Sequence, residues 1–307
     1  MTDMYQKRHS VLNKLIITIF EEEGLGDGIS KDAYSEFFSQ MYEKFDGEFE
    51  KVPTTIDEDE LVIIGRIISH AFITYGVFPL QISSASLTYY LYGEASDDEI
   101  LDSFKKFLLP KEADLFEKFK AGQSSLDVML GLILAEYNIF TKPTEGNINQ
   151  LMLKAGKNAL LRNPCFAFQS LVKGMNENPI WKRFSKPHIT AWFALNQPSP
   201  EKLIKCLLVT EENKQEGKVV TWLHRYIRGC SKDKLHKLVR FITGAVSITP
   251  TAIIKVTFVD QMVTSLRPGS KTCFKILYVP RQYFSFTNLK SNFDFYLDSK
   301  STWSVHD

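Results

Sequence analysis

The feature that most constrains the fold is a change of pattern near residue 210. Before it, apolar residues recur at helical spacing in one segment after another. After it come two strand-like runs, 252–259 and 273–279. The intervening segment 210–217 has four charged residues and one glycine among eight and no apolar anchor, which is typical of a linker or hinge. The sequence therefore predicts an α+β protein, with a helical domain of about 200 residues followed by an α+β domain of about 100.

The spacing of apolar residues, together with capping and turn signals, predicts the individual elements. Helices are expected from near residue 31 onward and over 61–75, 84–94, 97–108, 111–119, 125–141, 147–161, 165–177, about 200–208, 219–229, 232–242 and 286–299. Strands are expected over 11–20, 252–259 and 273–279. Asp57 or Asp59 is predicted to cap the helix at 61–75.

The charge balance argues against two classes of partner. The 37 basic and 36 acidic residues give a formal net charge of +1, which leaves no electrostatic footprint for nucleic acid or for an anionic membrane. The longest apolar stretch, 61–80, contains Arg66 and His70 and is predicted to be a buried helix rather than a membrane span. The first ten residues are polar and charged, unlike a signal peptide. We therefore expect no nucleic-acid or membrane partner and a cytoplasmic or nuclear location.

The four cysteines, Cys165, Cys206, Cys230 and Cys273, lie far apart in the sequence. No C-x-x-C pair and no cluster of histidines accompanies them, so neither a zinc site nor a disulfide framework is expected. The acidic run 21–23 is predicted to be a solvated turn rather than a metal site. The prediction is a protein with reduced thiols, no metal and no cofactor.

The run K-T-C-F-K-I-L-Y-V-P-R-Q-Y at 271–283 resembles the active-site signature of HECT-type ubiquitin ligases, roughly H-T-C-F-N-x-L-x-L-P-x-Y. The positions that agree in register are Thr272, Cys273, Phe274, Leu277, Pro280 and Tyr283. The positions that depart are Lys271, Lys275 and Val279. Upstream, L-V-R-F-I-T-G at 238–244 resembles the L-x-x-F-x-T-G element of the family.

Three earlier segments resemble the same family in the same order. Residues 20–38 are similar to its F-x-G-E-x-G-x-D-x-G-G-x-S-x-E-F-F segment, with an altered glycine pattern. Residues 63–72 are similar to its I-G-x-x-x-x-x-A-I helix, and 143–175 to the segment that ends in A-F-x-x-G-F. Because the similar patches are colinear over nearly the whole chain, the chain resembles a HECT domain. It is most similar to the short, divergent group that includes the G2/M-phase-specific ligase.

The resemblance implies a bilobal HECT-like fold. A mostly helical N-lobe, residues 1–209, would dock a ubiquitin-conjugating enzyme, and a hinge at 210–217 would join it to a smaller α+β C-lobe, residues 218–307. Cys273 would accept ubiquitin as a thioester and pass it to a lysine of a protein substrate whose identity the sequence does not give. The expected partners are therefore ubiquitin, a conjugating enzyme and that substrate.

The residues around Cys273 fit this role. Transthiolation needs a thiolate, and Lys271, Lys275 and Arg267 supply nearby positive charge that favours one. The Pro268-Gly269 pair is predicted to form a turn that exposes the loop. The alternative is that Cys273 is a small core residue at the start of a strand.

The other reactive side chains have simpler interpretations. Cys206 lies on an apolar helical face and is expected in the core. Cys165, at a helix start, is expected to pack at the core or its boundary, with some reactivity from the helix N-terminus. Cys230 is predicted to be an incidental surface thiol, and His70 a core histidine with a satisfied side chain rather than a ligand.

Two departures from the family pattern leave other hypotheses open. The stretch between the helix at 111–119 and Pro143, where HECT domains hold their docking subdomain, has only about twenty residues. Its apolar residues are predicted to form either a partly exposed docking surface or part of the core. They are Met129, Leu130, Leu132 and Leu134.

The second departure is at the C-terminus. Four residues from the end, where HECT tails often carry a phenylalanine, this chain has Ser304 beside Trp303. The alternative function is therefore a catalytically inactive HECT-like pseudoligase that acts as an interaction module, and an unrelated helical scaffold is a third hypothesis.

Overall fold

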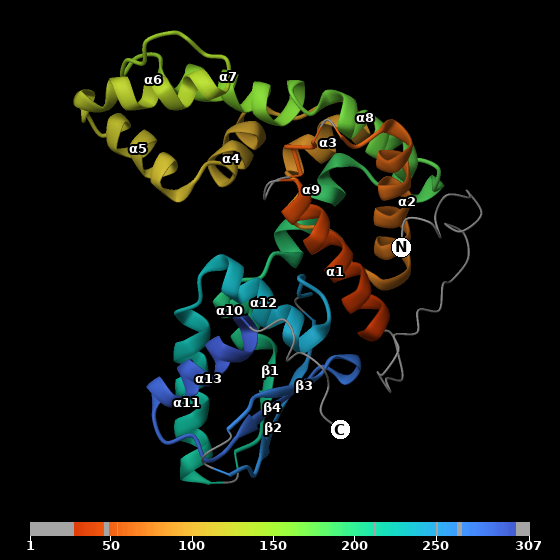
Figure 1. The fold of residues 1–307 in the computed structure, drawn as a ribbon, viewed down its shortest axis with the longest axis vertical. Helices are drawn as coiled ribbons and strands as arrows, with labels where there is room; N and C mark the ends of the chain where they lie inside the picture. The colour runs from red at the N-terminus through yellow and green to blue at the C-terminus, as the bar shows by residue number, and fades with distance from the viewer. Residues whose placement is uncertain are drawn as a thin grey trace. The chain divides into compact units, whose positions relative to one another are not determined.

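The computed structural model describes residues 28–45, 49–53, 55–211, 213–249, 251–262 and 266–298. The strand expected at 11–20, the acidic run 21–23 and the C-terminal pair Trp303 and Ser304 lie outside these residues. The chain forms two compact units (Figure 1). Of the described residues, unit 1 comprises those within 39–69 and 81–191, and unit 2 comprises those within 28–38, 70–80 and 192–298.

Unit 1 is helical in the residues that the structure describes. Its helices are α3 (Ser84–Tyr92), α4 (Asp97–Phe107), α5 (Pro110–Lys120), α6 (Asp127–Glu136), α7 (Ile148–Lys157) and α8 (Cys165–Met175). Three more helices have one end in each unit: α1 (Gly28–Lys44), α2 (Glu58–Tyr75) and α9 (Lys186–Asn196). Side-chain oxygens cap several starts, because the first N–H groups of a helix lack a helical partner. Ser96 and Glu99 form a capping box on α4, and Asp57 accepts from the Glu60 N–H of α2.

Helices α2 and α8 approach each other at backbone distance within unit 1. A Cβ atom placed on Gly65 would lie 2.0 Å from the Leu171 carbonyl oxygen, and one on Gly174 would lie 2.0 Å from the Val62 carbonyl oxygen. Only glycine permits this approach. The same crossing carries a two-pronged ion pair, in which the Nε and Nη2 atoms of Arg66 donate to the Glu177 carboxylate at 3.0 and 2.7 Å.

Unit 2 contains a four-stranded mixed sheet in the order β1-β2-β4-β3. The strands are β1 (Leu207–Val209), β2 (Ile254–Val259), β3 (Gly269–Lys271) and β4 (Ile276–Pro280). β1 and β4 pair with β2 in parallel, and β3 pairs with β4 antiparallel. Helices α10 (Pro200–Cys206), α11 (Lys214–Arg228), α12 (Lys232–Thr243) and α13 (Phe286–Asp298) share one hydrophobic core with the sheet, and α11 and α13 lie side by side (Figure 1).

The expected α+β class and most expected helices are confirmed, with several boundary corrections. The helix expected over 125–141 ends at Glu136, and Asn138 then takes a φ of 61° that breaks the helix. The helix expected over 147–161 ends at Lys157 and continues as a π-helical turn over 158–162. The strand expected to begin at Cys273 begins at Ile276, because 272–274 form a 3₁₀ turn.

The segment 210–217 is more ordered than its composition indicates. The Asn213 side chain caps α11 by accepting from the Gln215 and Glu216 N–H groups, so the described residues 214–217 are the first turn of that helix. Glu216 is fully buried. β1, which precedes the segment, pairs with β2, which follows it. A lobe boundary at 210–217 would divide this sheet between two lobes, and the hinge stays a prediction.

Candidate functional site

Cys273 lies in a one-turn 3₁₀ segment, Thr272–Phe274, between β3 and β4. Its side chain is half-buried, and its neighbour Phe274 is 66% exposed. On the far side of the turn, Leu277 and Val279 of β4 are fully buried in the unit 2 core. The turn therefore presents the thiol at the surface while the strand that follows it is fixed in the core.

The backbone of the turn is closed by Lys275. This residue has a φ of 52°, the left-handed conformation that residues other than Gly, Asn and Asp adopt at a cost. Its N–H donates to the Thr272 carbonyl at 3.2 Å, and its carbonyl accepts from the Lys255 N–H of β2 at 3.0 Å. The conformation of Lys275 thus closes the Cys273 turn and leads the chain into β4.

A second anchor lies before the cysteine. The Ser270 hydroxyl of β3 donates to the Phe241 carbonyl, in the last turn of α12, at 2.5 Å. Carbonyls in the last turn of a helix lack a helical N–H partner and accept such bonds readily. α12 contacts β3, the turn and β4, so it supports the whole strand–turn–strand segment. Sequence analysis did not single out Ser270 or Lys275 for these roles.

The surroundings of the thiol are simple. Lys271 and Lys275 flank it as expected, both half-exposed. Within the described part of the chain, the Cys273 thiol has no hydrogen-bond partner, so no side chain there is arranged as a dedicated base. The turn predicted at Pro268-Gly269 is wrong, because Gly269 already belongs to β3 and pairs with Tyr278. The site offers an accessible nucleophilic sulfur with neighbouring positive charge, which suits acyl exchange between thiols.

The other cysteines lie in different environments. Cys206 is buried as expected, and burial raises the pKa of its thiol, which donates to the Thr249 carbonyl. The prediction of a surface thiol at Cys230 is wrong. It packs against the unit 2 core, its thiol donates to the Tyr226 carbonyl, and burial raises its pKa to about 11. Cys165 is the half-buried first residue of α8.

His70 is a buried core residue, as predicted, with 2% of its surface exposed. Its Nδ1 lies 2.9 Å from the Tyr34 hydroxyl, and its ring packs edge-on against Tyr34 and Tyr75. Among the described residues, no group of three or more histidines, cysteines or carboxylates is arranged to hold a metal ion.

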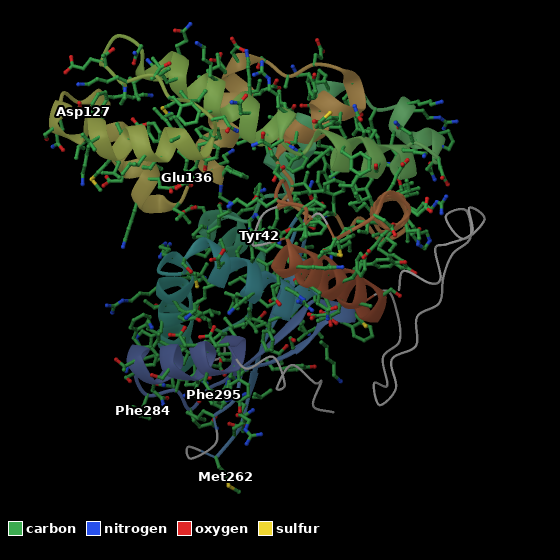
Figure 2. All side chains as sticks on the ribbon, turned by 45° about the horizontal axis from the view of Figure 1, so that its top comes forward. Tyr42, Asp127, Glu136, Met262, Phe284 and Phe295 are labelled. Atoms are coloured by element: carbon green, nitrogen blue, oxygen red, sulfur yellow. The ribbon has the colours of Figure 1, made fainter. Side chains whose placement is uncertain are left out.

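The stretch predicted as a docking surface divides into two faces. Leu130 and Leu134 of α6 are fully buried against α4, α5 and α7, whereas Met129 and Leu132 are 52% and 68% exposed. Figure 2 labels Asp127 and Glu136 at the two ends of this helix. Two more exposed apolar residues, Val128 and Phe140, lie near Met129 and Leu132 in the sequence. We call these four residues the α6 stripe.

A shallow groove runs beside the α6 stripe, with a volume of about 370 Å³. It is lined by the first turns of α6 and by residues 140–143. Two of the lining residues, Lys142 and Asp127, form an ion pair at 3.0 Å, and the hydrogen bond from Lys142 holds the pKa of the Asp127 carboxyl below its usual value. An exposed apolar stripe beside a groove is the common form of a surface that binds another protein. The exposure of Met129 and Leu132 confirms the prediction that part of the stretch before Pro143 is solvent-exposed.

Residues 165–305 match the family model of the HECT domain, described as a ubiquitin-transferase. The match covers a little under half of the chain and includes α8, the unit 2 sheet and the Cys273 turn. It supports a HECT-domain protein, a family whose activity is ubiquitin transfer. A comparison with curated proteins gave no match. Across the described residues, no helix has the length and apolar character to cross a membrane.

Proposed function

We propose that this chain is a HECT-type ubiquitin-protein ligase that takes ubiquitin from a conjugating enzyme as a thioester on Cys273 and transfers it to a substrate lysine. The observation that carries the proposal is the surface turn at 272–274. It presents a half-buried thiol beside an exposed Phe274, inside the segment that matches the HECT family model. Among HECT proteins we place the chain with the short, divergent group, in the cytoplasm or nucleus.

The proposed chemistry balances as two acyl transfers. The Cys273 thiolate attacks the thioester carbonyl on the conjugating enzyme, forms a new sulfur–carbon bond and displaces the enzyme's cysteine as a thiolate, which takes up a proton. The neutral substrate amine then attacks the Cys273 thioester, an amide forms as the carbonyl–sulfur bond breaks, the Cys273 thiolate leaves, and the proton lost by the amine passes to solvent. The first step exchanges one thioester for another of similar energy, so it needs an accessible thiolate more than a dedicated base.

The α6 stripe is the surface that we assign to the conjugating enzyme. The stripe lies in the place of the family's docking subdomain. The opposite, buried face of helix α6 packs against α4, α5 and α7 and holds the helix in place. The stripe is short, so the docking surface is smaller than in larger HECT domains. A pseudoligase that binds a conjugating enzyme without accepting ubiquitin is the alternative, and the short docking segment favours it.

The direct test of the nucleophile uses serine and alanine variants with a panel of charged conjugating enzymes. Wild type is expected to form a ubiquitin adduct that a thiol reductant cleaves. Cys273→Ser is expected to form a slower adduct that resists the reductant, because an oxyester replaces the thioester. Cys165→Ser, Cys206→Ser and Cys230→Ser are the matched controls and should keep the thioester. A thioester on Cys273→Ala would show that another residue accepts ubiquitin.

The hinge is part of the proposal and has its own test. Leu208 of β1 and Lys255 of β2 are exposed register partners, and neighbouring strands lie at a spacing that a disulfide spans. A Leu208→Cys, Lys255→Cys pair would lock β1 onto β2. If lobes move about 210–217 by separating these strands, the oxidised lock stops transfer and a thiol-free phosphine reductant restores it. Full transfer by the locked protein would place the hinge outside the 207–255 span, for example at 197–199 before α10.

A further inference from the structure

We propose that Ser270 is a positioning residue for the nucleophile, fixing the Cys273 turn to the C-terminal turn of α12. The Ser270 hydroxyl lies three residues before Cys273 and donates to the Phe241 carbonyl at 2.5 Å. The proposal rests on the proposed function for its transfer readout, whereas its structural readout is independent of that function.

The alternation of side-chain directions along β3 explains why the Ser270 side chain faces α12. Successive strand residues point to opposite faces, and β3 pairs with β4 through Gly269, Ser270 and Lys271. Ser270 is the middle residue of this three-residue strand, and the strand ends directly in the Cys273 turn. Among the strands that the structure describes, β3 lies at the edge of the sheet and pairs with β4 alone. A side-chain bond to α12 therefore removes the freedom that a short edge strand would keep.

The acceptor is itself firmly held. Arg240, the residue before Phe241, is 10% exposed at its side chain, and its Nε and Nη2 atoms contact Asp32 at 3.0 Å and Glu36 at 2.8 Å. The Ser35 hydroxyl donates to the Gly244 carbonyl at 2.8 Å. The last turn of α12 is thus fixed by α1 on one side and bonded to β3 on the other, all within unit 2. Because charged and neutral hydrogen bonds hold this last turn of α12, it gives the Cys273 turn a fixed support.

Thioester exchange depends strongly on such positioning, because the attacking sulfur and the carbonyl carbon must meet in one geometry and small displacements lower the rate. Loss of one neutral hydrogen bond is expected to leave unit 2 folded. It would nevertheless let β3 and the turn open more often. Ser270 acts through the turn and does not itself touch ubiquitin in this proposal.

The test compares Ser270→Ala, Ser270→Thr and Ser231→Ala in the full chain. Ser231 caps the opposite end of α12 by accepting from the Lys234 N–H, so its alanine variant weakens the same helix without touching the turn. Hydrogen exchange of the amides at 271–275 is expected to be about fivefold faster in Ser270→Ala. The threonine variant keeps the hydroxyl and should match wild type, as should Ser231→Ala at these amides.

The second readout is thioester formation at several concentrations of charged conjugating enzyme. Ser270→Ala is expected to lower the maximal rate several-fold, by at most the roughly fivefold change in opening of the turn, and to leave the half-saturating concentration unchanged, because the α6 stripe lies in unit 1. Unchanged exchange in Ser270→Ala overturns the proposal, as does a faster exchange with a normal maximal rate, or an equal loss of rate in Ser231→Ala. If wild type forms no thioester, the proposed function fails, and the exchange measurement still decides whether Ser270 holds the turn.

Discussion

Substituting alanine for Gly65 should destabilise the protein far more than an ordinary glycine-to-alanine change in a helix. The added Cβ would lie 2.0 Å from the Leu171 carbonyl oxygen and 3.0 Å from the Met175 nitrogen, both backbone atoms of α8. Backbone cannot rotate away as a side chain does, so α2 and α8 must separate. Separation weakens the bond from the Ser69 hydroxyl to the Met175 carbonyl and the ion pair of Arg66 with Glu177.

The magnitude follows from opposing contributions. Alanine in a helix interior is favoured over glycine by about 1 kcal/mol. Forcing extra atoms into a packed contact costs about 1–3 kcal/mol, and a weakened hydrogen bond and ion pair cost about 1 kcal/mol or more in addition. The expected net loss in the free energy of unfolding is about 1–3 kcal/mol. Gly174→Ala, whose Cβ would lie 2.0 Å from the Val62 carbonyl oxygen, should lose a similar amount.

Urea unfolding followed by circular dichroism measures this loss, and Gly131→Ala is the matched control. A Cβ on Gly131 of α6 would meet its nearest neighbour, the Pro143 Cδ, at 4.0 Å, so this variant should gain up to about 1 kcal/mol. The double variant at 65 and 174 should lose less than the sum of the two single losses, because the first substitution already separates the helices. A Gly65→Ala protein as stable as Gly131→Ala would refute the backbone contact.

Three further outcomes are expected. Leu132→Asp should weaken binding of the conjugating enzyme at least tenfold and change the free energy of unfolding by no more than about 0.5 kcal/mol. Leu130 is buried on the same helix, so Leu130→Asp should unfold unit 1. Equal unfolding by both variants would show that the α6 stripe is part of the core. Lys275→Gly should raise the free energy of unfolding by about 1 kcal/mol, because glycine adopts a φ of 52° without strain, and a denaturation midpoint below that of wild type would contradict this. Burial opposes the charge on Asp294, but hydrogen bonds from Lys234 and its other partners hold the pKa of this carboxyl at about 2. The carboxylate's contribution to stability is therefore full above about pH 4 and is lost as the pH falls toward 2. Asp294→Asn should flatten the pH dependence of the unfolding midpoint in that window, and an unchanged pH dependence would contradict the assignment.

The elements that could be predicted from sequence are those whose own periodicity specifies them. Long amphipathic helices such as α11 and α12 follow from apolar spacing and capping residues. β1 and β3 have three residues each, too few for a pattern, and exist because a partner strand supplies their hydrogen bonds. The helix α9 was not predicted, because it exposes and buries apolar residues alike and its sequence shows no clear apolar face.

The candidate site shows the same division. Cys273 could be found because a short motif surrounds it, whereas the roles of Ser270 and Lys275 depend on a distant carbonyl and on a backbone angle. The segment 210–217 was interpreted as a linker or hinge from its composition and from the resemblance. A capping signal was present in the sequence, Asn213 followed three residues later by Glu216, and the structure buries that glutamate completely, with its carboxylate 3.6 Å from Arg281.

A ligase and a pseudoligase differ in which surfaces selection must maintain. Variants of the α6 stripe and of the Cys273 turn test the two surfaces separately. A module that only binds a conjugating enzyme needs the α6 stripe and has no use for a thiol held in a strained surface turn. A ligase needs both, because the stripe brings the charged enzyme and the turn presents the sulfur. The strain at Lys275 and the bond from Ser270 concern the position of Cys273 and nothing on α6. Binding that survives Cys273→Ala, together with transfer that requires Cys273 and is slowed by Ser270→Ala, would therefore identify a working ligase, whereas binding with no transfer in wild type would identify the interaction module.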